Sequence, residues 1–89
     1  MISLEMIHYK ENRITGSIES PISAWTDTAK EIPDEATISS TLEAELAESK
    51  SPNLVQACLN VWLGDEENWQ RELLKSVALE ASQLKGEPK

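Results

Sequence analysis

The feature that most limits how this chain can fold is a stretch without a single charged residue, residues 51–64, in a sequence otherwise rich in charge. Apolar side chains dominate the stretch, so it has to lie inside the protein, away from water. Its polar residues Asn53, Gln56 and Asn60 recur at intervals of three and four, which places them on one strip of an α-helix. The spacing therefore predicts a largely apolar helix at the centre of the fold.

Further helices are predicted on both sides of this stretch. Apolar residues at helical spacing indicate one helix over residues 38–49 and another over residues 65–85. Gly64 is suited to end the central helix, because glycine readily adopts the left-handed conformation common at helix ends. The connection at Gly64 is short, so we expect the last two helices to pack as an αα-hairpin.

The N-terminal part predicts β-structure. Apolar and polar residues alternate on both sides of a polar break near residue 11, which indicates an antiparallel β-hairpin over residues 2–19. Residues 20–37 are rich in Ser, Thr and Pro and read as an irregular connection, with residues 22–25 as a candidate third strand. With helices over residues 38–85 and a tail over residues 86–89, the sequence predicts one small domain of the α+β class.

The charge of the chain is concentrated in one segment. Residues 27–67 hold ten acidic and two basic side chains, which accounts for the whole formal charge of −8, since the flanking parts balance. A field of this sign repels phosphate backbones, so we expect no direct binding of DNA or RNA and an attraction to a basic protein surface. The alternative interpretation is an acidic surface that only keeps the protein soluble.

The residues that usually perform catalysis or bind metals are scarce. His8 is the only histidine and Cys58 the only cysteine, so no His and Cys cluster can be assembled, and three isolated glycines cannot form a phosphate-binding loop. We interpret His8 as an ordinary sheet residue and Cys58 as a core residue. The sequence predicts no enzyme activity, no cofactor and no metal site.

The sequence also indicates a compartment. A single cysteine excludes an internal disulfide, and no apolar run approaches the roughly 20 residues needed to cross a bilayer. The first residues lack the pattern of a signal peptide. We therefore expect a cytoplasmic protein without a membrane function.

The function predicted from these observations is non-catalytic binding of another protein. The favoured form is a small regulator or inhibitor of the immunity, antitoxin or anti-defence type, whose carboxylates engage a basic surface that handles nucleic acid. The alternative is an assembly subunit that forms homo-oligomers through the open edges of its hairpin. Trp25 is interpreted either as a plug of the core or as an exposed anchor for the partner. The candidate contact residues are Trp25, Asp34, Glu35, Glu43, Glu45 and Glu48.

Overall fold

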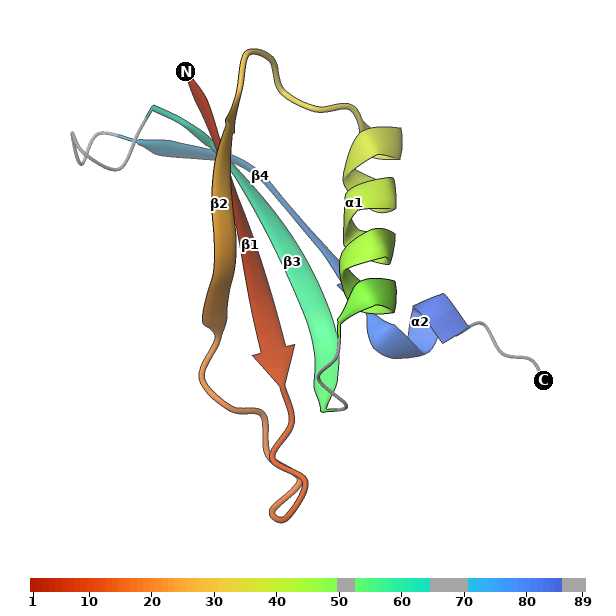
Figure 1. Ribbon diagram of the computed structural model, residues 1–89. Coiled ribbons are helices and arrows are strands. Elements are labelled where there is room, and N and C mark those ends of the chain that lie inside the picture. Colours follow the sequence, from red (N-terminus) through yellow and green to blue (C-terminus); the bar gives the residue numbers. More distant parts are fainter. Residues whose placement is uncertain (50–52, 65–70, 86–89) are drawn as a thin grey trace.

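The computed structural model describes residues 1–49, 53–64 and 71–85, which form an antiparallel sheet with helices on one side (Figure 1). The described elements are, in chain order, β1 (Ile2–Lys10), β2 (Ile22–Ala29), α1 (Glu35–Glu48), β3 (Leu54–Leu63), β4 (Glu72–Glu80) and α2 (Ala81–Lys85). The strands lie in the order β2-β1-β3-β4, and each neighbouring pair is antiparallel. The fold is therefore mostly β, and the predicted set of about three helices is wrong.

Within the central, charge-free stretch, residues 54–63 form a strand, not a helix. β3 pairs with β1 on one edge and with β4 on the other, so its backbone groups are satisfied by two neighbouring strands. Ala57, Leu59 and Val61 alternate along β3 and are buried, while the residues between them face the other side of the sheet. The segment lies inside the protein, as predicted. Its buried side chains recur every second residue, as in a strand, and not every 3.6 residues, as in a helix.

The predicted αα-hairpin is replaced by a β-hairpin. β4 runs antiparallel to β3 from Glu72 to Glu80, and only the short α2 follows it. Gly64 does adopt a positive φ of 104°, but it stands after a strand instead of a helix. The predicted start of the third helix, residues 65–70, lies outside the described residues.

The N-terminal hairpin is longer than predicted. β1 pairs with β2, from Ile2 opposite Ala29 to His8 opposite Ile22, so much of the predicted irregular connection is a strand. The predicted return strand near residue 14 is a turn instead. Asn12 Oδ1 accepts hydrogen bonds from the backbone of the two residues after Arg13, and Gly16 has a φ of 77°. A polar side chain that caps its own turn competes with strand pairing.

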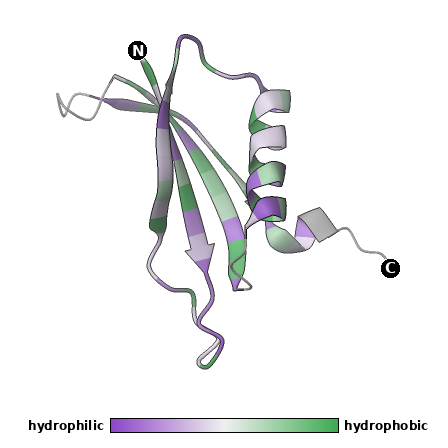
Figure 2. Ribbon diagram, in the orientation of Figure 1, coloured by the Kyte–Doolittle hydropathy of each residue, from purple (hydrophilic) through white to green (hydrophobic). Residues whose placement is uncertain are grey.

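The core lies between the sheet and α1. Met6, Leu59 and Val61 come from the central strands and meet Ile38 and Leu42 of α1, and all five side chains are almost fully buried. Figure 2 shows hydrophobic residues along the length of β1 and β3. α1 packs over β3 and β4, and α2 lies near the C-terminal end of α1 (Figure 1). No described segment covers the opposite face of the sheet.

Candidate functional site

The predicted contact residues gather around α1 but differ in exposure. Glu35, Glu43 and Glu48 are exposed on α1, and Asp34 is exposed at its N-terminus. Glu45 of α1 and Trp25 of β2 are half-buried. The structure thus separates the set into four exposed carboxylates and two residues that contact the body of the protein.

Glu45 joins three elements of the fold through its carboxylate. Trp25 Nε1 on β2 donates a hydrogen bond of 3.0 Å to Glu45 Oε1, and His8 Nε2 on β1 lies 2.6 Å from Glu45 Oε2. Trp25 also packs against the core cluster, which is the position that a plug occupies. These contacts hold α1 against the β1–β2 half of the sheet.

The exposed carboxylates of α1 have no lysine or arginine partner among the described residues. The sequence contains no lysine or arginine from residue 31 to residue 49, and none of the exposed carboxylates of α1 makes an ion pair with a described residue. We call Asp34, Glu35, Glu43 and Glu48 the acidic face. At 100° per residue, Glu48 lies on the same side of α1 as Glu45 and Glu43 lies on the other, while Glu35 lies above the stripe of Leu42 in the first turn. The negative charge therefore extends around the exposed surface of the helix.

Asp34 also begins α1 as its N-cap. Its Oδ1 accepts a hydrogen bond of 2.8 Å from the backbone of Thr37, and hydrogen bonding to Thr37 lowers the pKa of the Asp34 carboxyl below its ordinary value of 3.8. The helix was predicted to start later, at residue 38. The early start follows from this cap, which satisfies a backbone donor that would otherwise be free.

We expect Asp34→Ala to reduce stability at neutral pH by removing the cap. Because the folded-state pKa is lowered, the stabilisation by the ionised carboxyl is present above the unfolded value and is lost as pH falls through the folded value. The difference between wild type and Asp34→Ala should therefore shrink as pH falls below the ordinary aspartate pKa of 3.8. Urea unfolding over a pH series measures it, and Asp34→Asn, a cap that does not titrate, is the control. A difference that stays constant through this range would contradict the assignment.

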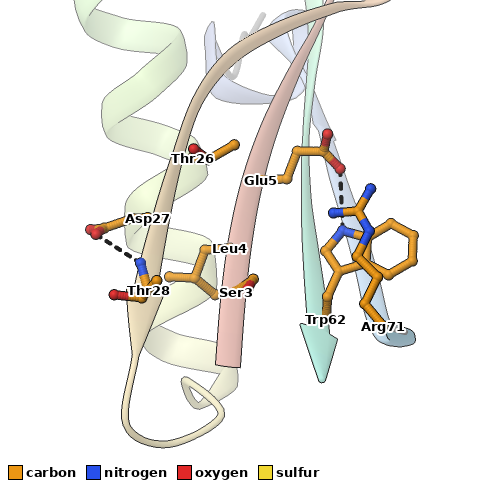
Figure 3. A pocket seen from close by; sticks show the side chains of 8 residues that line it. All are labelled: Ser3, Leu4, Glu5, Thr26, Asp27, Thr28, Trp62 and Arg71. Carbon is orange, nitrogen blue, oxygen red and sulfur yellow. Dashed lines mark hydrogen bonds between the residues drawn. The ribbon is translucent and has the colours of Figure 1, made fainter. Parts of the chain in front are cut away.

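A polar pocket lies on the sheet face opposite α1 (Figure 3). It has a volume of about 360 Å³ and is lined by residues of β1 and β2 together with Trp62 and Arg71. Trp62 Nε1 donates to Glu5 Oε1 at 3.2 Å, and the Arg71 guanidinium lies 3.9 Å from the centre of the Trp62 ring. Such a cation–π contact orders the arginine over the indole. The helical interpretation of residues 51–64 concealed this pocket, because the pocket depends on strand alternation.

The described side chains provide no nucleophile beside a base. His8 is opposite Ala57 in the β1–β3 register, so His8 and Cys58 point to opposite faces of the sheet. Cys58 is 8% exposed and lies 3.3 Å from the Ser76 hydroxyl. Among residues 1–49, 53–64 and 71–85, no three His, Cys, Asp or Glu side chains are grouped to hold a metal ion. No helix in that part of the chain is both long and apolar enough to cross a membrane.

Comparison of the chain with protein-family models, with curated proteins and with solved structures finds no match.

Proposed function

We propose that this protein is a non-catalytic binding protein, a small regulator or inhibitor of the immunity, antitoxin or anti-defence type. Its acidic face engages the basic surface of another protein. The observation that carries the proposal is the set of exposed carboxylates on α1 without a lysine or arginine on the same helix. Carboxylates in this arrangement can occupy cationic sites that otherwise bind nucleic-acid phosphates.

The anchoring of α1 supports this proposal. Ile38 and Leu42 fix the inner side of the helix in the core, and Glu45 ties it to β1 and β2. The exposed carboxylates are therefore presented on a backbone that need not become ordered on binding, which lowers the entropic cost of association. Solubility alone does not require this anchoring.

We expect the variant Glu35→Lys, Glu43→Lys, Glu48→Lys to bind its partner at least about tenfold more weakly and with a flatter salt dependence. Glu19→Lys, Glu72→Lys, Glu80→Lys is the matched control, since it changes the net charge equally at exposed positions outside α1. Immobilised wild-type protein isolates the partner from a lysate of its cells at low salt. Titration over a salt series then compares the variants. Equal losses, or no loss, in the two variants would contradict a role for the acidic face.

A further inference from the structure

The two edges of the sheet differ in charge. β4 carries Glu72, Lys75 and Glu80 along its length, and charged side chains are a common protection against pairing with another chain. β2 is as exposed but has Asp27 as its only charged residue. No described segment pairs with the outer edge of β2. On this edge the Thr28 amide already donates to Asp27 Oδ1 at 2.8 Å, and the other outward backbone groups are offered to an additional strand.

The charge around the β2 edge selects the strand that can pair there. Asp27 and, just after the strand, Glu31, Asp34 and Glu35 are exposed, with Lys30 as the one base between them. A second copy of β2 would bring the same acidic residues towards this set, and like charges oppose such pairing. A lysine- or arginine-rich strand would be attracted instead.

The side of α1 that carries Glu45 and Glu48 also has small residues. A hollow of about 530 Å³ there is lined by residues of α1 alone, among them Ala36, Ser40 and Ala44. Glu45 contacts Trp25, so this side of α1 faces the β2 half of the sheet. Asp27 is opposite Leu4 in the register, and Leu4 packs against the core, so strand alternation places Asp27 on the α1 side, while at the β2 edge it also borders the pocket of Figure 3.

We propose that the outer edge of β2 binds an extended, basic segment of the partner protein as an additional strand. This inference rests on the proposed function and adds the docking mode. The backbone of the segment pairs with β2, and its alternate Lys or Arg side chains point to the α1 side, between Asp27 and Glu48. β2 and α1 are connected through residues 30–34, so Glu48 lies towards the Ile22 end of the strand (Figure 1). Cations spaced along one face of the segment therefore meet carboxylates at both ends.

Synthetic peptides test this docking mode. The probe is a peptide of about ten residues, a usual upper length for a strand, that alternates lysine and threonine. We expect it to slow amide hydrogen exchange at alternate residues of β2, since the amides between them already face β1. The same peptide with N-methylated backbone positions keeps its charge but cannot pair, and the protection should disappear. A peptide with glutamate in place of lysine should not bind.

Single charge reversals locate the peptide. Asp27→Lys should weaken its binding about tenfold, while Glu43→Lys, on the other side of α1, should change it far less. Unchanged β2 exchange with the basic peptide, or equal binding of its N-methylated form, would overturn the inference. So would protection of β2 that grows with protein concentration alone, which would indicate self-pairing.

The outcomes also separate this inference from the proposed function. One outcome is that the triple lysine variant of α1 no longer binds the partner, while the basic peptide leaves amide exchange in β2 unchanged. In that case the acidic face binds the partner, and the inference that β2 pairs with a strand of the partner is wrong. If the peptide protects β2 while the same variant keeps full affinity for its partner, edge docking stands and the role of the acidic face fails.

Discussion

Replacing Leu59 by alanine is expected to lower the free energy of unfolding by about 2–5 kcal/mol. Leu59 lies in the middle of β3, is 1% exposed and belongs to the cluster that includes Met6 and Leu42. Truncation removes buried apolar atoms and leaves a cavity between the sheet and α1, where both surfaces are held by other contacts. Urea unfolding at equilibrium measures the change through the midpoint.

Leu63→Ala is the matched control for this prediction. It is the same substitution in the same strand, but Leu63 is 46% exposed at the end of β3. We expect a loss of less than about 1 kcal/mol, as for substitutions away from the core. Similar losses at the two positions would mean that β3 is not buried at its centre, and the described packing would then be wrong.

The sequence was sufficient to predict that residues 54–63 are buried, but not that they form a strand. Along β3 the α1-facing residues are all apolar, while the other face combines Gln56 and Asn60 with Cys58 and Trp62. The apolar members of that mixed face hide the alternation, and the two amides are four apart, which also fits a helix. A short apolar run is ambiguous between the two periods, and the sheet decides between them through pairing at long range.

The turn at Gly64 was predicted more successfully than the elements beside it. A glycine with positive φ occurs both at helix ends and in turns between strands. Gly64 therefore indicates a turn, but not whether a helix or a strand precedes it. β2 was predicted only in part, as a candidate strand over residues 22–25, for another reason. As an edge strand with one face open, it needs few apolar side chains, and Trp25 and Ala29 are its only residues that pack against the core.

The acidic residues of the candidate site were identifiable from sequence, but their different roles were not fully distinguished. Glu45 stands three residues after Leu42 and seven after Ile38, which is the spacing of the buried stripe of α1. That spacing distinguishes it from Glu43 and Glu48, which are exposed. The positions of Trp25 and His8 beside it depend on the β1–β2 register, which no local pattern specifies.

We expect Glu45→Ala to lower the free energy of unfolding by about 1–3 kcal/mol, because it leaves the Trp25 donor and His8 without their acceptor in a half-buried place. Glu43→Ala, in the same helix but exposed, should change stability by less than about 0.5 kcal/mol. Both variants remove one carboxylate, so their difference isolates the contacts of Glu45 from the effect of net charge. Urea unfolding at neutral pH compares them.

A double-mutant cycle assigns the loss to its cause. Trp25→Phe retains an aromatic ring at the core but removes Nε1, so the coupling between Trp25→Phe and Glu45→Ala should be at least about 0.5 kcal/mol. Strictly additive effects would mean that the hydrogen bond contributes nothing and that Glu45 acts only by packing. If Glu45 instead serves only as a contact for the partner, Glu45→Ala would leave unfolding unchanged and weaken binding as much as Glu43→Ala does. The two measurements together decide whether Glu45 belongs to the acidic face or to the structure that holds α1 in place.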